Sequence, residues 1–483
     1  MGVSIETASR DPLALDADAA GRFAESEARA LVVARRDGGT AYAAVTVPID
    51  PGLDLAAAVF GARRPDERFF CLEQPDRAGF ALASLGAEAT LEARGPDRFR
   101  DLARASRKLG ARVAIGGEVD PGAPAASGPV LVGGFAFAAD GGSAPEWGSL
   151  APAQLLLPTI SLARHRGEAR LTLCAAVEPD DAPGEAVARA RTRLEGVRPA
   201  PMPVLDPEPV ERATVSGAAP PSHYESAVAR AVERIRSGEL QKVVLAREVR
   251  VHAPAAPDPA PVFDALRAAF PACYCWCAGT PELAFVGASP ELLVRREGAR
   301  AQTVALAGTT RRSADPAVDD HLGEQLLQSD KNREEQAIVA RRIERALAPV
   351  SLWVAGGDSP ALVKVQNVQH LATAIRAQLA EPLGALELAG LLHPTPAVCG
   401  EPREQAEPLI PALEGLDRGW YAGGIGWTDL AEDGEFCVAL RCALIRGSVA
   451  HLYAGCGVVR DSSPAAELEE TEVKLQALLP LLA

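Results

Sequence analysis

An acidic residue lies on the apolar stripe of a long predicted helix. The helical pattern covers residues 318–347, and Glu335 precedes Ile338 and Val339 of the stripe by three and four positions. Residues with this spacing share one face of a helix. A carboxylate that points inward needs a positive partner or a metal ion, because an unpaired buried charge is costly.

A second helix with acidic residues is predicted to begin near Ser463. Its residues Glu467, Glu470 and Lys474 are spaced i, i+3 and i+7, which places them on one face. Carboxylates from two helices suit Mg²⁺, which takes one or two protein carboxylates and fills its other positions with water or ligand. The alternatives are a solvated Glu470–Lys474 ion pair and a Glu335 at the edge of its stripe. Spacing alone does not decide between them.

Two further residues are candidates for proton transfer. Glu291 follows an apolar strand in the segment GASPELLVR, and apolar surroundings would raise the pKa of its carboxyl group and suit it to general acid catalysis. Lys242 precedes an apolar run and is a candidate general base, although a buried stem with a surface head is the simpler reading of one Lys. His370 and His393 are possible polar ligands, although lone histidines are more often hydrogen-bonded core residues.

The elements that must position these residues follow from periodicity. A helix is predicted from Ser222, with a capping box to Glu225 and an end at Gly238. A strand rich in β-branched residues follows at 242–251, so Lys242 stands at its start. Strands are also predicted at 69–72, 130–137 and 170–175, and several more between 422 and 459. Because strict βαβ alternation is missing, the pattern favours an α+β architecture with mainly antiparallel sheet.

Composition limits the class of function. The formal net charge of −15 argues against a nucleic-acid or anionic-membrane partner, because there is no basic excess to neutralise phosphates. No apolar run approaches the length of a membrane span, so a cytoplasmic protein is expected. The nine cysteines form no Cys-x-x-Cys pair, and Cys273, Cys275 and Cys277 recur with the period of a strand, which predicts reduced, buried thiols.

An ordered set of motifs carries a family resemblance over residues 222–479. The motifs are LQKVVLAR (240–247), GASPELLVR (287–295), AGTTRR (307–312), SDKNREEQ (329–336), LLHPTPAVCG (391–400), LRCA (440–443) and YAGCGVVRDSSPAAELEETEVK (453–474). Together they resemble the chorismate-utilising enzymes, which include isochorismate, salicylate, anthranilate and aminodeoxychorismate synthases. Residues 1–195 are only faintly similar, through FFCLEQPD and VGGFAF.

The resemblance implies one large α/β unit, in which two packed, mainly antiparallel sheets are flanked by helices. The Pro-, Ala- and Gly-rich stretch at 196–221 would then not separate independent domains. The prediction is a single domain over 1–483, with a weakly matching part at 1–195 and the catalytic core at 222–483. We further expect a monomer without a glutaminase subunit.

The resemblance also assigns roles within the site. It implies that Mg²⁺ is bound by Glu335 and Glu470, with Glu467 nearby, and that the ion holds the ring carboxylate of chorismate. The positions that correspond to substrate-contacting residues, or that lie in the surrounding shell, are Thr309, His370, Ala397, Tyr421, Arg441, Gly455 and Lys474. Gln336 departs from the family pattern, which commonly has His after the metal-binding Glu, so the residues that orient the ligands are less certain.

Two positions narrow the expected reaction. Water-adding members of the family carry Lys at position 242, whereas the ammonia-using anthranilate enzymes typically carry Gln. Isochorismate synthases usually have Ala at position 397, where salicylate and anthranilate enzymes tend to have Thr. The expectation is therefore isochorismate formation, in which Lys242 activates water for attack at C2 and Glu291 protonates the departing 4-hydroxyl group. The alternatives are a salicylate synthase, which also eliminates pyruvate, and a non-catalytic relative that binds chorismate.

Overall fold

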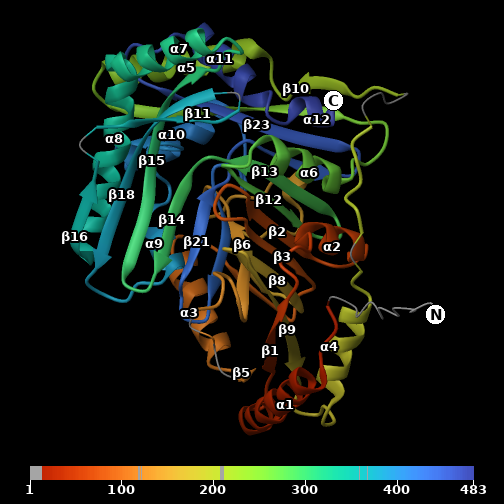
Figure 1. Ribbon diagram of the computed structural model, residues 1–483. Helices are drawn as coiled ribbons and strands as arrows, with labels where there is room; N and C mark the ends of the chain where they lie inside the picture. The colour runs from red at the N-terminus through yellow and green to blue at the C-terminus, as the bar shows by residue number, and fades with distance from the viewer. Residues whose placement is uncertain are drawn as a thin grey trace.

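The computed structural model describes residues 13–117, 120, 122–198, 200–206, 211–357, 359–366 and 368–483. Two large β-sheets pack together, with helices around them (Figure 1). Among the described pairings, β1 with β5 is parallel and all others are antiparallel. The prediction of two mainly antiparallel sheets flanked by helices is confirmed.

The larger sheet has 13 strands. Its order is β10 (Thr214–Gly217), β11 (Lys242–His252), β23 (Val449–Val458), β22 (Cys442–Arg446), β13 (Leu283–Ser289), β12 (Tyr274–Gly279), β2 (Phe69–Gln74), β3 (Phe80–Leu85), β8 (Ile160–His165), β9 (Glu168–Val177), β1 (Ala41–Ile49) and β5 (Val113–Gly116), with β19 (Gly400–Glu401) paired to β11.

The smaller sheet has 10 strands. Its order is β16 (Ser351–Gly356), β18 (Val368–Leu379), β15 (Arg300–Arg311), β14 (Leu292–Glu297), β21 (Gly434–Val438), β20 (Gly424–Asp429), β6 (Val130–Phe135), β7 (Ala153–Leu157) and β4 (Ala89–Ala93), with β17 (Ala361–Lys364) paired to β18. Both sheets mix strands from 1–195 with strands from 222–483. This sharing supports the single-domain prediction, which remains a prediction. Residues 199 and 207–210 of the expected linker lie outside the described residues.

Twelve α-helices lie in the described part of the chain. They are α1 (Ala17–Asp37), α2 (Leu55–Ala62), α3 (Arg98–Gly110), α4 (Glu185–Glu195), α5 (Pro221–Arg236), α6 (Pro259–Ala269), α7 (Pro316–Gln328), α8 (Asp330–Leu347), α9 (Ala385–Leu392), α10 (Arg403–Glu414), α11 (Pro464–Leu475) and α12 (Leu479–Leu482). Figure 1 shows α5, α7 and α11 gathered at one end of the molecule, while α1 and α4 lie at the other end.

The hydrophobic core has two layers, one on each face of the larger sheet. Strand β12 shows the division, because Trp276 belongs to the cluster between the sheets, whereas Cys275 and Cys277 belong to the cluster beneath the outer helices. Successive side chains of a strand point to opposite faces, so a period-two run of small thiols fits the helix-covered face. All nine cysteines are described as free and buried, as predicted.

Two details of the helix predictions were wrong. The pattern at 318–347 forms two helices, because Ser329 has extended backbone and its side chain caps α8 by accepting from the Asn332 N–H. Helix α5 begins at Pro221, and Pro220 occupies the N-cap without a side-chain cap, so the Ser222–Glu225 capping box does not form. Proline at the first helical position needs no hydrogen bond from its nitrogen, which makes this start possible.

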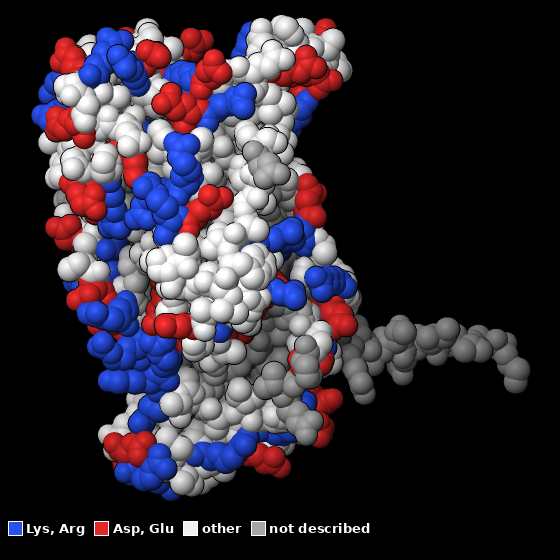
Figure 2. All heavy atoms as spheres, turned by 90° about the vertical axis from the view of Figure 1, so that its left-hand side faces the viewer, with Lys and Arg blue, Asp and Glu red and all other residues white. Residues whose placement is uncertain are grey.

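The charged surface is mixed on the face formed by α8, β16 and β18. Figure 2 shows acidic and basic side chains interspersed over this face, with Lys and Arg more frequent toward its lower part. The exposed edge strand β16 also carries Leu352 and Trp353, which are 73% and 51% exposed.

Among the described residues, no helix is long and apolar enough to cross a membrane.

Candidate active site

The acidic residues singled out in the sequence converge from two helices. Glu335 points inward from α8 and is 8% exposed, while Glu467 and Glu470 lie on α11, which packs against β23. The ligand atoms of Cys456, Glu467 and Glu470 lie within 4.8 Å of one another. The inward carboxylates expected from spacing are therefore present.

Each of these carboxylates lies beside a lysine. The Nζ of Lys242 is 2.9 Å from Glu335, the Nζ of Lys474 is 2.7 Å from Glu470, and the Nζ of Lys331 is 2.9 Å from Glu467. The Glu470–Lys474 pair thus forms, as the alternative reading of the sequence allowed, but both residues line a cavity. Burial alone would raise the pKa of Glu470, but the Lys474 ammonium lowers it below its ordinary value.

Two glycines of β23 make room for these groups. A Cβ at Gly457 would lie 2.1 Å from Glu335 Oε1, and a Cβ at Gly455 would lie 2.9 Å from the Tyr421 hydroxyl. The carbonyl of Gly455 also accepts a 2.8 Å hydrogen bond from Lys474. The strand therefore needs glycine at these positions, where a side chain would collide with Glu335 or with Tyr421.

Lys242 is the first residue of β11, as predicted, and is fully buried. Its ammonium forms the ion pair with Glu335 but has no hydrogen-bond acceptor among the described residues. A buried ammonium normally finds such acceptors. Lys242 does not itself line the cavity, but Glu335, its ion-pair partner, does.

Glu291 lies in the turn between β13 and β14 and is 3% exposed. Burial raises the pKa of Glu291 to about 8, although Lys242, Arg441 and Lys474 act in the opposite direction. The carboxyl group is therefore mostly protonated at neutral pH and can donate a proton. The raised pKa expected from the apolar surroundings agrees with the structure.

A chain of hydrogen bonds runs from Thr309 through His370 to Arg441. Thr309 Oγ1 lies 3.1 Å from His370 Nδ1, and Arg441 lies 3.0 Å from His370 Nε2. Because guanidinium can only donate, Nε2 must accept and Nδ1 carries the ring proton. Burial and Arg441 lower the pKa of His370 well below its ordinary value, which keeps the ring neutral.

The backbone around this chain is unusual at three positions. Gly308 sits at a β-bulge of β15 with φ of +78°, and a bulge re-aims the neighbouring side chain of Thr309. Ala422 and Arg441 have φ of 60° and 51°, a region that favours glycine. All of these residues line the same cavity. Strained backbone of this kind tends to cluster at functional sites.

One cavity between the two sheets collects most of the predicted site. Ten of the predicted residues line it: Glu291, Thr309, Glu335, His370, Ala397, Tyr421, Arg441, Gly455, Glu470 and Lys474. Lys242 and Glu467 do not line the cavity but contact residues that do. Lys242 pairs with Glu335, and the ligand atom of Glu467 lies within 4.8 Å of that of Glu470. His393 does not line this cavity, and its Nε2–H donates a 2.9 Å hydrogen bond to the carbonyl of Phe137.

Sequence reasoning missed some residues of the site. Tyr453 lines the cavity and stacks on Tyr421, with ring centroids 5.2 Å apart. Its position two residues before Gly455 on a predicted strand was the available signal, because alternate residues share a face. Lys331 was missed because only tertiary packing brings α8 to Glu467. Gln336 donates to Thr373 on β18 at 2.7 Å, so it ties its helix to the sheet.

The acidic residues fit a bound Mg²⁺. Glu335 on α8 and Glu470 on α11 line the same cavity and offer hard carboxylate oxygens, and Gly457 keeps the space beside Glu335 free of a side chain. Three lysines neutralise these carboxylates in the structure, so a bound cation would take the place of one or more of these ammonium contacts.

Comparison with protein families places this geometry in context. The family model described as chorismate binding enzyme matches residues 28–483. The chain belongs to the chorismate-binding enzyme family. The matched residues include most of the N-terminal part at 1–195 and the whole catalytic core at 222–483.

Within this family, isochorismate synthase homologues match most of the chain. The salicylate biosynthesis isochorismate synthase of Pseudomonas aeruginosa is 38% identical over 90% of this chain and 88% of its own length. The isochorismate synthase MenF of Bacillus subtilis is 32% identical over 88% of this chain and 89% of its own length. The solved structure of the menaquinone-specific isochorismate synthase MenF of Escherichia coli covers 95% of this chain and all of that chain, with 28% identity and a TM-score of 0.76.

Proposed function

We propose that this chorismate-binding enzyme converts chorismate to isochorismate, with addition of water at C2 and loss of the 4-hydroxyl group. The observation that carries the proposal is the buried Glu291 carboxyl group, whose pKa is raised to about 8, on the same cavity as Glu335, the ion-pair partner of Lys242. A proton donor and a candidate base at one cavity are what this displacement requires. The similarity to isochorismate synthases over about nine-tenths of the chain supports it.

Arg441 is proposed to bind a carboxylate of the substrate. It is 8% exposed, lines the cavity and forms no ion pair with a described residue. Its side-chain hydrogen-bond partner among the described residues, His370, is neutral, so no carboxylate pairs directly with the guanidinium. An Arg in this state suits an anionic ligand, because its fork of donors matches carboxylate geometry.

The proton steps are assigned to Lys242 and Glu291. Lys242 would take a proton from the attacking water, and Glu291 would give its proton to the departing hydroxyl group, so that one water enters and one leaves. As the base, Lys242 must be free of its ion pair with Glu335. The metal role proposed for Glu335 is compatible with this, since its carboxylate would then bind Mg²⁺ in place of the Lys242 ammonium.

Glu335 and Glu470 are proposed to hold Mg²⁺, with Glu467 as a nearby carboxylate. When bound, Mg²⁺ supplies positive charge that orients a substrate carboxylate. The methyl group of Ala397 lines the cavity where Thr would add a hydroxyl group. We therefore propose that pyruvate elimination is weak or absent.

The decisive test is product analysis with pure protein, chorismate and Mg²⁺, with a chelator-treated control. We expect isochorismate to form only with Mg²⁺ and without stoichiometric pyruvate. Stoichiometric pyruvate would instead identify a salicylate synthase. Unchanged chorismate that still binds by calorimetry would identify a non-catalytic relative.

A variant test separates the metal role from the substrate role. Glu335→Ala should abolish the dependence of activity and of substrate binding on Mg²⁺, because it removes a carboxylate ligand. Glu344→Ala, a change further along the same helix, is the matched control. A normal Mg²⁺ titration of Glu335→Ala would exclude Glu335 as a ligand.

A further inference from the structure

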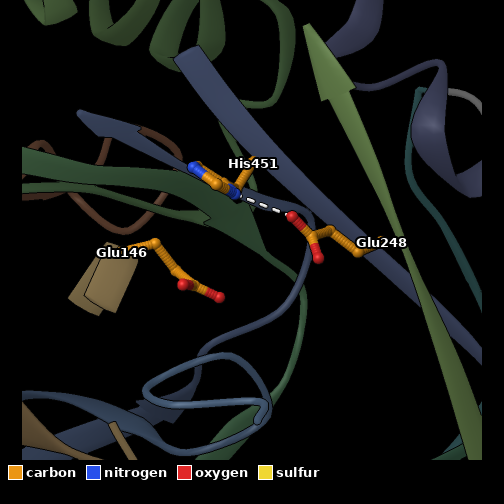
Figure 3. A group of neighbouring side chains, drawn as sticks. All are labelled: Glu146, Glu248 and His451. Atoms are coloured by element: carbon orange, nitrogen blue, oxygen red, sulfur yellow. Dashed lines mark hydrogen bonds and ion pairs between the residues drawn. The ribbon is translucent and has the colours of Figure 1, made fainter. Parts of the chain in front are cut away.

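A second group of metal-ligating side chains lies outside the cavity. Glu248 comes from β11, His451 from β23 and Glu146 from the short 3₁₀ helix η1 (Pro145–Trp147). Figure 3 shows these three side chains facing a common space. Their ligand atoms lie within 4.8 Å of one another, and His451 Nδ1 is 2.7 Å from Glu248 Oε1.

This group is separate from the carboxylates proposed for Mg²⁺. His451, Tyr453, Gly455 and Gly457 alternate along β23 and so share one face of the strand. The cavity lies at the glycine end, whereas His451 is four residues before Gly455, roughly 14 Å along an extended strand. The ring of Tyr453 stands between the two places.

Two polar groups at this second place lack partners. The Glu146 carboxylate makes no hydrogen bond or ion pair with any residue that the structure describes. The hydroxyl of Tyr453, a residue that is 2% exposed, also has no hydrogen-bond partner there. Tyr453 lies directly opposite Glu248 in the β11–β23 ladder, and the charges of Glu248 and Glu146 act on its hydroxyl.

A buried hydroxyl without a partner needs an explanation, because such groups are almost always hydrogen-bonded. A simple Glu248–His451 pair would account for those two residues alone. It would leave the buried Tyr453 hydroxyl, on which the charges of Glu248 and Glu146 act, without a hydrogen-bond partner. A bound cation that carries a water satisfies both this hydroxyl and the Glu146 carboxylate.

We propose that Glu146, Glu248 and His451 form a binding site for a divalent transition metal such as Zn²⁺. Two carboxylates and a neutral imidazole balance the charge of the ion, and imidazole favours Zn²⁺ over Mg²⁺. Coordination through Nδ1 requires the neutral tautomer that carries its proton on Nε2, so the hydrogen-bond contact between Nδ1 and Glu248 is given up. A water on the metal would supply the partner that the Tyr453 hydroxyl lacks.

Arg250 competes with the metal at this site. Its Nε and NH2 donate to the two oxygens of Glu248 at 2.7 and 3.2 Å. The Arg250 side chain is 40% exposed, so it can turn into solvent when a cation takes its place. Removing Arg250 should therefore strengthen metal binding, an effect opposite to that of removing a ligand.

The test is calorimetric titration of chelator-treated full-length protein with Zn²⁺, in buffer that contains excess Mg²⁺. We expect a Zn²⁺ site that Glu146→Gln and His451→Gln each weaken by roughly tenfold or more. Arg250→Gln should tighten the same site. His252→Gln is the matched control, because His252 is exposed at the end of β11 and should leave the titration unchanged.

Thermal melting guards against a folding artefact. Glu146→Gln breaks no described hydrogen bond, so without metal it should melt at the temperature of the parent protein. Added Zn²⁺ should raise the melting temperature of the parent more than that of the variant, since binding to the native state stabilises it. A Zn²⁺ titration that is identical in the parent, Glu146→Gln and His451→Gln would overturn the proposal.

Discussion

Arg418 and Arg441 are both buried arginines, but their surroundings differ. Arg418, in the wall behind the cavity, donates to both oxygens of Glu414 and to the carbonyls of Val244 and Val398. Arg441, in the cavity itself, contacts the neutral His370 and forms no ion pair with a described residue. Burial lowers the pKa of both, but Glu414 reverses the effect at Arg418, whose pKa is raised, whereas that of Arg441 stays lowered.

The difference separates structural from functional charge. Glu414 completes its own bonding by accepting from the Ala246 N–H at 2.6 Å, so the pair fixes β11 and the segment around Val398. The donors of Arg418 are therefore already used within the protein and are not available to a ligand. Lys242 has no hydrogen-bond acceptor among the described residues, and Arg441 has no carboxylate partner there, so both keep donors available for an anion.

The largest expected effect is on catalysis. Lys242→Gln should reduce isochorismate formation by roughly 10³-fold or more, since an amide cannot accept the proton from water. Chorismate binding in the presence of Mg²⁺ should be largely retained by calorimetry. Lys108→Gln, at an exposed site on α3, should have normal turnover. Normal turnover in Lys242→Gln would remove Lys242 as the base.

Breaking the buried Arg418–Glu414 ion pair should lower the stability of the protein. Arg418→Gln leaves the Glu414 carboxylate buried and unpaired, and should lower the free energy of unfolding by about 3–5 kcal/mol, measured by chemical denaturation. The double variant Glu414→Gln, Arg418→Met should recover part of the loss, because no unpaired charge remains. An unchanged denaturation midpoint in Arg418→Gln would contradict the structural role.

Replacing Arg441, which has no carboxylate partner among the described residues, should affect substrate binding rather than stability. Arg441→Gln should leave the unfolding free energy nearly unchanged and raise the KM for chorismate by roughly tenfold to a hundredfold, the value of a hydrogen bond to a charged group. Arg376→Gln, at an exposed position on β18, is the control. A large loss of stability with a normal KM would show that Arg441 has a structural role like that of Arg418.

The smallest effect is a pH dependence. Glu291 must be protonated to act as the acid, and its pKa is about 8, so the rate should fall above pH 8 toward a tenfold loss per pH unit. Below this value the carboxyl group stays protonated and this limit disappears. The kcat profile of Glu291→Gln should be lower and lack the step near pH 8. A parent profile that is flat from pH 7 to 9 would exclude Glu291 as the acid.

Much of the fold was predictable because its signals are local. Apolar segments between polar turns gave the strands that became β2, β6 and β9, and a run of β-branched residues gave β11. The predicted start of the terminal helix near Ser463 was also correct, since Ser463 is the N-cap of α11. The break at Ser329 was missed, since a helical apolar pattern continues across it and only the cap geometry ends α7. The order of strands in the two sheets was not available from any local signal.

The site was predicted as residues but not as interactions. Residue types and motif order selected ten residues that line one cavity. Spacing along a helix could not tell that Glu467 meets Lys331, or that Arg441 meets a neutral His370, because these partners come from distant segments. The group of Glu146, Glu248 and His451 had no sequence signal for the same reason.

The sequence by itself determined the family, the chemical types of the site residues and the strand on which Lys242 begins, since these depend on residue identity and short-range periodicity. Only the tertiary structure decided which buried charged groups pair with an opposite charge and which do not. That distinction depends on how many donors and acceptors meet in space, and so it separates Arg418 from Arg441, two residues of the same type that lie 23 positions apart.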